Sequence, residues 1–293
     1  MAANTAVASI GDVLQSGYGP TPTPDFAVAP TAEEVAFFQE HGYLAVERLT
    51  TDEELAWLER IFDHIFDPAR AGGPGAPLDR SGVLAEGEPS RLSQAFFPEM
   101  VFAEIMQSAF RKNAKRYAAA LLGVEEARLS SWGHMIRKPP GGREVAWHQD
   151  KAYWQPELDY CALGVWLPLH DVSVEMGAMQ FIPGSHKRGL RRHRHLEDPI
   201  HNLLTVDEAI DASSAVACPL RAGGATFHHS ETLHYTAPNT TGRERKAFPT
   251  EYQLTPVKRS TPLDMPWTLE HRARIGPQPL SYVADGRFVL VEI

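Results

Sequence analysis

The spacing of hydrophobic positions divides the chain into two parts that meet near residue 129. In the first part apolar residues recur every three or four positions, which predicts helices. Thr31 is suited to cap a short helix, and Thr51 a second helix over about 52–66, because a threonine side chain can accept a hydrogen bond from the first turn. Between these helices, residues 42–49 alternate in polarity as in a strand.

A longer helix is predicted from Pro98 to about Leu122, with Gly123 at its end. From residue 129 onward the pattern changes to short apolar or alternating runs that are separated by Pro, Gly and Asn, and no helical pattern intervenes before 206–211. Regularly spaced short strands are typical of an antiparallel sandwich or jelly roll. We therefore expect an α+β fold that is mainly β, with the N-terminal helices packed on one face.

A chain of 293 residues can form one large domain with a substantial core. Residues 1–30 are rich in Ala, Thr, Pro and Gly and are expected to form an irregular arm. Residues 31–293 are expected to form a single domain, with a helical block at about 31–123, a β core at about 129–254 and a C-terminal extension at about 255–293. The segment 185–216 is too long for a plain hairpin loop, which is typical of a lid or a binding loop.

Composition narrows the function classes further. The formal net charge of -9 makes non-specific binding to nucleic acid unfavourable. No apolar run is long enough for a transmembrane helix, and no basic segment followed by an apolar run indicates a secretory signal. Cys161 and Cys218 form neither a disulfide framework nor a zinc motif, which fits the reducing cytoplasm. The sequence does not predict an oligomeric state.

The first chemical feature is the run Trp147-His148-Gln149-Asp150. On an extended strand, residues two positions apart project from the same face, so His148 and Asp150 can converge on one metal ion. A second histidine from elsewhere would give the two-histidine, one-carboxylate set of non-haem Fe(II) oxygenases, which leaves three positions open. An H-x-D run alone is a weak signal, because the same pattern occurs on polar faces of surface strands.

The second feature strengthens this interpretation. His234 lies 86 residues after His148, on a later predicted strand, and Asn239 and Arg245 follow it. A guanidinium can form two parallel hydrogen bonds with a carboxylate, so Arg245 is suited to bind the far end of a dicarboxylic co-substrate. His228 and His229 are neighbouring alternatives for the second imidazole, but Asn239 and Arg245 are in register with His234.

The stretches HQDKAYW, VWLPLHDVSVEMGAMQFIPGSHKRG and GGATFHHSETLHYTAPNTTGRERKA closely resemble the phytanoyl-CoA dioxygenase family, which includes ectoine-hydroxylase-like and natural-product oxygenases. The resemblance covers about residues 32–254. It implies a double-stranded β-helix, a jelly roll of the cupin-like group, preceded by helices. It also implies roles for particular residues, because the motifs match position by position.

By this resemblance the iron ligands are His148, Asp150 and His234. The resemblance assigns four further residues to 2-oxoglutarate, namely Arg245 and Thr236 at its distal carboxylate, Trp166 packed against it, and His134 lining its pocket. The family often has another residue type at the position of His134. Alternation along the preceding strand places Trp132, His134, Ile136 and Lys138 on one face, which favours an inward His134.

The resemblance further implies the reaction. Such an enzyme uses Fe(II), 2-oxoglutarate and O2, releases succinate and CO2, and removes a hydrogen atom from a small organic substrate. In the related halogenases a small residue takes the place of Asp150, so the carboxylate here favours hydroxylation, desaturation, epimerisation or ring closure. The alternatives are a cupin-like metalloenzyme, or a binding protein, that does not use 2-oxoglutarate. Arg245 argues against the first and the intact ligand set against the second.

Two local features carry expectations of their own. The basic run 187–195 is more typical of a solvated loop than of a lid that attracts an anionic substrate, because charge runs are usually solvated. Pro249 lies in the strand of Arg245 and cannot donate to a β ladder. We therefore expect this strand to lie at a sheet edge or to bulge at Pro249.

Overall fold

The computed structural model describes residues 18–70, 77–79, 92–196, 203–268, 281–284 and 287–290. Part of the predicted N-terminal arm lies outside these residues. The described part of the arm, from Tyr18, packs against helix α2 (Asp52–Ile65). There the hydroxyl of Thr21 donates a hydrogen bond of 2.6 Å to the buried carboxylate of Glu54.

The helices begin where their capping residues predict. Helix α1 (Ala32–His41) follows Thr31, whose side chain forms a reciprocal capping box with Glu34, and α2 follows Thr51. The single helix predicted from residue 98 to about 122 is wrong. This segment forms α3 (Pro98–Val101), a 3-10 turn (Ala103–Gln107) and α4 (Ala109–Leu122).

The break in this segment has a local cause. Phe102 leaves the helical region, and the side chain of Ser108 caps α4 by accepting a hydrogen bond from the Arg111 backbone. Gly123 ends α4 in the left-handed conformation, as predicted. Among the described residues, no helix combines the length and the apolar character that crossing a bilayer requires.

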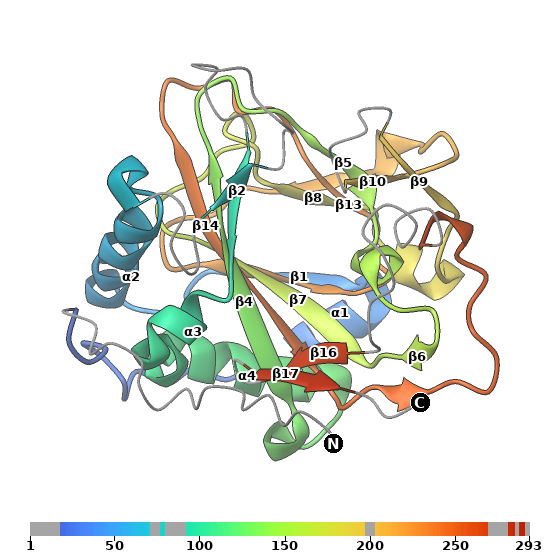
Figure 1. Ribbon diagram of the computed structural model, residues 1–293, viewed down its shortest axis with the longest axis horizontal. Coiled ribbons are helices and arrows are strands. Elements are labelled where there is room, and N and C mark those ends of the chain that lie inside the picture. Colours follow the sequence, from blue (N-terminus) through green and yellow to red (C-terminus); the bar gives the residue numbers. More distant parts are fainter. Residues whose placement is uncertain are drawn as a thin grey trace, which may run out of the picture.

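Two antiparallel sheets form the body of the molecule. The larger has the order β1-β12-β7-β14-β4-β3-β2, with strands at Tyr43–Val46, Ala225–His229, Ala162–Pro168, Arg245–Gln253, Ser130–Lys138, Ser93–Phe96 and Leu78–Asp79. The smaller has the order β11-β8-β13-β5, with strands at Val216–Cys218, Met179–Phe181, His234–Thr236 and Val145–His148. Figure 1 shows β8, β13 and β5 above β1 and β7 of the larger sheet. The mainly β fold with N-terminal helices is confirmed.

Three short strand pairs complete the described structure: β9 with β10 (His193–His195 and Leu204–Val206), β6 with β15 (Leu158–Asp159 and Val257–Lys258), and β16 with β17 (Ser281–Ala284 and Arg287–Leu290). The first pair belongs to the long segment 185–216. It is attached to the smaller sheet, because the hydroxyl of Thr205 donates to the carbonyl of Trp147 on β5.

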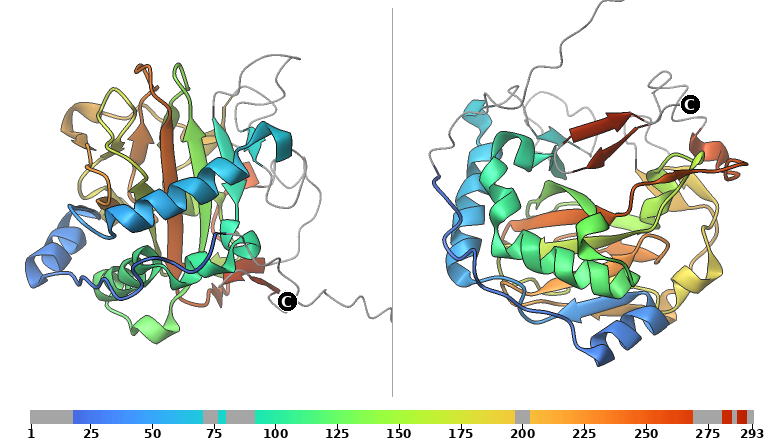
Figure 2. Two further views of the ribbon diagram at one scale, coloured as in Figure 1. Left: turned by 90° about the vertical axis from the view of Figure 1, so that its left-hand side faces the viewer. Right: turned by 90° about the horizontal axis from the view of Figure 1, so that it is seen from below.

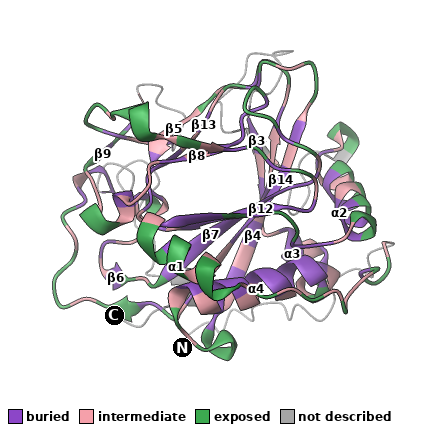
Figure 3. Ribbon diagram, turned by 180° about the vertical axis from the view of Figure 1, so that it is seen from behind, coloured by how far each residue is buried: buried purple, intermediate pink, exposed green. Residues whose placement is uncertain are grey.

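The main hydrophobic core lies between the helices and the outer face of the larger sheet. Helices α2 and α4 cover this face in Figure 2, and Figure 3 shows that their inner sides and strands β7 and β12 are buried. The core joins side chains of α2, α4, β7, β12 and β14, among them Leu58, Phe62, Phe110, Val165, Phe227 and Phe248. A smaller cluster around Trp166, Met179 and Phe181 fills one end of the space between the two sheets.

The expectation for Pro249 is wrong. Strand β14 lies inside the larger sheet, between β4 and β7, and the register of both pairings is the same before and after Pro249. Only the pairing with β4 is interrupted, at Phe248 and Pro249. A single missing N–H is therefore accommodated by a gap in one ladder, because the seven pairs with β4 on either side of the gap and the continuous pairing with β7 hold the register. Arg245 keeps its inward position at the start of this strand.

Candidate active site and metal centre

His148, Asp150 and His234 converge from two neighbouring strands. His148 ends β5, His234 begins β13, and the two residues are direct partners in this antiparallel pair. Asp150 lies just beyond β5, at the start of a 3-10 turn, and not on the strand itself. Potential ligand atoms of the three side chains all lie within 4.8 Å of one another. The Nε2 atoms of His148 and His234 are 3.8 and 3.4 Å from Asp150 Oδ1.

Backbone carbonyls orient both imidazoles. The Nδ1 of His148 lies 2.7 Å from the carbonyl oxygen of Ala146, and that of His234 lies 2.9 Å from the carbonyl oxygen of Thr232. Because a carbonyl only accepts, each Nδ1 carries a proton and each Nε2 presents its lone pair toward Asp150 in the neutral ring. Both rings are thus prepared to act as ligands through Nε2.

Electrostatics favour the same donor set. Burial, together with the nearby His234, lowers the pKa of His148 to about 3. Burial alone would raise the pKa of Asp150, but His234 and a hydrogen bond from His228 hold that pKa well below its usual range. A neutral imidazole beside a carboxylate that remains ionised is what a divalent cation requires. The group of one carboxylate and two imidazoles fits Fe(II), with positions left for a bidentate co-substrate and O2.

His228 is placed beside the group by a hydrogen bond. Its Nε2 lies 2.9 Å from Asp150 Oδ2, the carboxylate oxygen that is not shared with His234. Gly164 makes room for this contact, because a Cβ there would lie 2.5 Å from the Nε2 of His228. His229 faces the other way, where its Nδ1 accepts from the backbone N–H of Glu231.

Arg245 is buried at the other end of the cavity wall. It is 1% exposed, its Nη1 donates to the carbonyl of Gly177 at 2.6 Å, and its guanidinium lies over the ring of Trp166 at 5.3 Å. Burial lowers its pKa to about 9. Trp166 therefore supports the guanidinium as well as lining the cavity.

Sequence reasoning missed the role of Lys138, although alternation placed it on the inward face. Its side chain is fully buried, and its Nζ lies 2.8 Å from both the Thr236 hydroxyl and the Ala237 carbonyl. Burial and the charge of Arg245 lower its pKa to about 5. Two basic side chains thus lie buried near Thr236, one a charged guanidinium and the other an amine that has lost its proton. An anion in the adjacent cavity would stabilise the charged form of both.

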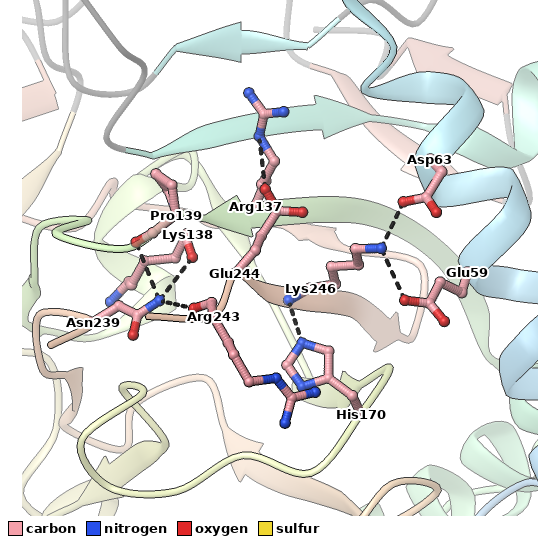
Figure 4. Close-up of polar contacts among 10 residues, drawn as sticks. All are labelled: Glu59, Asp63, Arg137, Lys138, Pro139, His170, Asn239, Arg243, Glu244 and Lys246. Atoms are coloured by element: carbon pink, nitrogen blue, oxygen red, sulfur yellow. Dashed lines mark hydrogen bonds and ion pairs between the residues drawn. The ribbon is translucent and has the colours of Figure 1, made fainter. Parts of the chain in front are cut away.

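Asn239 fixes the backbone that carries these groups. Its Nδ2 donates to the carbonyls of Lys138, Pro139 and Arg243 at 3.2, 3.1 and 2.7 Å (Figure 4). It therefore joins the end of β4 to the residues that precede Arg245 on β14. On the opposite side of β14, Lys246 points away from the cavity toward Glu59 and Asp63 of α2 (Figure 4).

A cavity of about 380 Å³ connects these groups. All seven residues singled out in the sequence line it, namely His148, Asp150, His234, Arg245, Thr236, Trp166 and His134. Phe96, Trp132 and His134 form an aromatic cluster in its wall, with ring centroids 5.4 to 6.5 Å apart. Glu251 also lines the cavity and was not foreseen, because no sequence motif distinguishes it from other strand residues.

In the basic run 187–195, four of the five lysine and arginine side chains form surface ion pairs and both histidines are buried. Ion pairs join Lys187 to Glu40, Arg191 to Glu208, and both Arg192 and Arg194 to Asp207. His193 and His195 are buried, and the backbone N–H of Gln149 donates to His193. These contacts favour the structural role of the run over attraction of an anionic substrate.

The fold is a double-stranded β-helix in which two imidazoles and a carboxylate lie in the same cavity as a buried arginine. This combination is that of the Fe(II)- and 2-oxoglutarate-dependent oxygenases. Residues 38–247 match the family model described as phytanoyl-CoA dioxygenase, so the chain belongs to that family. It is therefore a 2-oxoglutarate-dependent non-haem iron dioxygenase that uses Fe(II), 2-oxoglutarate and O2 and acts on a small-molecule substrate.

Named relatives agree with this class. The chain is 29% identical over 216 residues, 71% of its own length and 73% of the relative's, to a probable alpha-ketoglutarate-dependent hypophosphite dioxygenase of Stutzerimonas stutzeri. It is 31% identical over 250 residues to phytanoyl-CoA dioxygenase domain-containing protein 1 of Bos taurus, covering 72% of this chain and 86% of that protein. The crystal structure of EvdO2 from Micromonospora carbonacea var. aurantiaca, also solved with 2-oxoglutarate, has a TM-score of 0.72 and 32% identity over 83% of this chain and 99% of that one.

Proposed function

We propose that His148, Asp150 and His234 bind the catalytic Fe(II) and that the enzyme oxidises a C–H bond of a small organic substrate of secondary metabolism. The convergence of these three side chains within 4.8 Å at the end of a cavity is the observation that carries this proposal. When bound, the iron and O2 supply the oxidising chemistry, in which 2-oxoglutarate is converted to succinate and CO2. Hydroxylation, desaturation, epimerisation and ring closure are the outcomes that product analysis distinguishes.

Backbone carbonyls fix the tautomer of the two imidazoles in the set His148, Asp150 and His234, here called the metal group. The carbonyls of Ala146 and Thr232 hold the Nδ1 protons of His148 and His234, so each Nε2 remains available to the metal. His228 donates to the outer oxygen of Asp150 and thereby leaves Oδ1 directed at the two imidazoles. This arrangement orients the ligands before the metal arrives, which favours tight binding.

We further propose that Arg245 and Thr236 bind the distal carboxylate of 2-oxoglutarate, with Trp166 and His134 beside the co-substrate. Arg245 supplies a fork of N–H donors whose position is fixed by Gly177 and by the ring of Trp166. Thr236 accepts a hydrogen bond from Lys138, so its own proton is free to point into the cavity. The excess of buried positive charge at this end is what a carboxylate would neutralise.

The proposal extends to the organisation of the chain. We infer that residues 31–293 act as one oxygenase domain with residues 1–30 as an arm, and that the enzyme works in the cytoplasm. The contacts of the described arm residues with α2, and the two unpaired cysteines, support these inferences.

The test is the formation of the weak visible charge-transfer band when 2-oxoglutarate is added to the anaerobic Fe(II) protein. We expect the band in the wild type and its loss or strong weakening in Arg245→Ala. Lys246→Met serves as the matched control, because Lys246 is the next residue on β14 but is directed at α2. A wild-type protein that contains iron but shows no band would contradict the proposal.

A further inference from the structure

Glu251 carries an unexplained carboxyl group into the cavity. It lies on β14 six residues after Arg245, so strand alternation places both side chains on the same face. Its direct partners in the neighbouring strands are Trp132 on β4 and Gly164 on β7. Both Trp132 and Gly164 line the cavity together with Glu251. Burial in the cavity wall, to which the charge of Asp150 adds, raises the pKa of Glu251 to about 8.

The register also places Glu251 close to the metal group. A Cβ on Gly164 would lie 2.5 Å from His228 Nε2 and 3.2 Å from Asp150 Oδ2, so this part of β7 passes directly beside the metal group. Glu251 is the neighbour of Gly164 one strand away, and adjacent strands lie roughly 4.8 Å apart. A molecule held by Glu251 would therefore lie next to the reacting atoms rather than at a remote subsite.

The remaining cavity wall restricts what such a molecule can be. Among the described residues that line the cavity, Arg245 is the single lysine or arginine, and it belongs to the co-substrate end. The wall around Glu251 consists largely of aromatic and aliphatic groups, including Phe96, Trp132 and Ile136. An anionic group placed here would find no lysine or arginine in the adjacent wall to balance it, whereas a ring with a polar N–H or O–H group would be satisfied by the carboxyl group of Glu251.

We propose that Glu251 anchors the substrate by accepting a hydrogen bond from a hydroxyl or amine group, and that the enzyme selects neutral or cationic ring-containing substrates over carboxylates and phosphates. This inference rests on the proposed function, because it assigns the substrate end of the same cavity. Trp132 acts as a positioning residue, since it is the direct partner of Glu251 across β4 and β14 and its ring forms part of the apolar wall.

Matched small probes test this inference on the full chain loaded anaerobically with Fe(II) and 2-oxoglutarate. Benzyl alcohol, benzylamine and benzoate share one ring and differ in the polar group, and their binding is followed by calorimetry. We expect the alcohol or the amine to bind about tenfold more tightly than benzoate to the wild type, as one hydrogen bond to a buried carboxyl provides. Glu251→Leu should abolish this preference. Glu251→Gln should retain the preference for the alcohol and lose that for the amine, which distinguishes a hydroxyl donor from a cationic one.

Glu244→Gln is the matched control, because Glu244 directly precedes β14 and pairs with Arg137 outside the cavity lining (Figure 4). It should behave as the wild type. Benzoate binding as tightly as both other probes, or an unchanged preference in Glu251→Leu, would overturn the inference. The charge-transfer band of the same wild-type sample separates the two proposals. A band without probe preference refutes only the role of Glu251, and a probe preference without a band refutes only the role of 2-oxoglutarate.

Discussion

Replacement of Lys138 by methionine should weaken 2-oxoglutarate binding through its effect on Thr236. The Lys138 ammonium or amine donates to the Thr236 hydroxyl at 2.8 Å, and it has no exposure to solvent. With this donor in place, the oxygen of Thr236 is occupied and its proton is directed toward an incoming carboxylate. Loss of one hydrogen bond to a charged group costs roughly 1.5–3 kcal/mol, which corresponds to about a 10- to 100-fold rise in the Kd for 2-oxoglutarate.

The assay is a titration of the anaerobic Fe(II) protein with 2-oxoglutarate and, in parallel, with 2-oxopentanoate, which lacks the distal carboxylate. We expect Lys138→Met to weaken 2-oxoglutarate binding strongly and 2-oxopentanoate binding little. Lys246→Met should change neither, because this lysine pairs with Glu59 and Asp63 on α2 (Figure 4). Equal weakening for both ligands would indicate a general disturbance of the fold and would refute the reasoning, as would an unchanged Kd for 2-oxoglutarate.

Four further predictions follow from the same geometry. The pKa of Lys138 is near 5, below its unfolded value, and a bound dianion should raise it. Binding of 2-oxoglutarate should therefore take up a proton and become tighter as the pH falls from 8 toward 6. Calorimetry in buffers of different ionisation enthalpy measures this proton uptake. His234→Ala should purify with little iron, measured by elemental analysis against the wild type. Gly164→Ala should displace His228 from the metal group and lower iron affinity, measured by competition with a chelator. Glu54→Ala removes an acceptor of four buried hydrogen bonds and should lower the free energy of unfolding by about 3 kcal/mol, measured by denaturant titration.

The sequence predicts those parts of the fold that depend on local interactions. The caps at Thr31 and Thr51 and the end at Gly123 are found where expected, because each depends on backbone groups a few residues away. The segment 98–122 shows the limit of this approach. Its apolar spacing suits one helix, but Ser108 accepts a local hydrogen bond that begins a new helix, and periodicity does not include that competition.

The convergence of His148, Asp150 and His234 was predictable for a different reason. His148 and Asp150 are two positions apart, so they converge whether Asp150 continues the strand or, as found, begins a 3-10 turn. Their proximity to His234 depends on the pairing of β5 with β13, which the family motif implied and periodicity did not. Lys138 and Glu251 were not recognised as parts of the site, because their significance depends on which residues of neighbouring strands lie opposite them.

The position of Pro249 shows how strongly β14 is constrained. Arg245 and Glu251 both face the cavity and lie six residues apart, which corresponds to roughly 20 Å along a strand, with Pro249 between them. A shift of register by one residue would turn both side chains away from the cavity and remove both from the roles proposed for them. Because pairs on both sides of β14 keep the same register across Pro249, the missing N–H interrupts only the pairing with β4, at Phe248 and Pro249, without displacing Arg245 or Glu251. Strand β14 thus fixes the distance between Arg245 and Glu251 in the cavity wall. The residues His148 and His234 line the same cavity from β5 and β13.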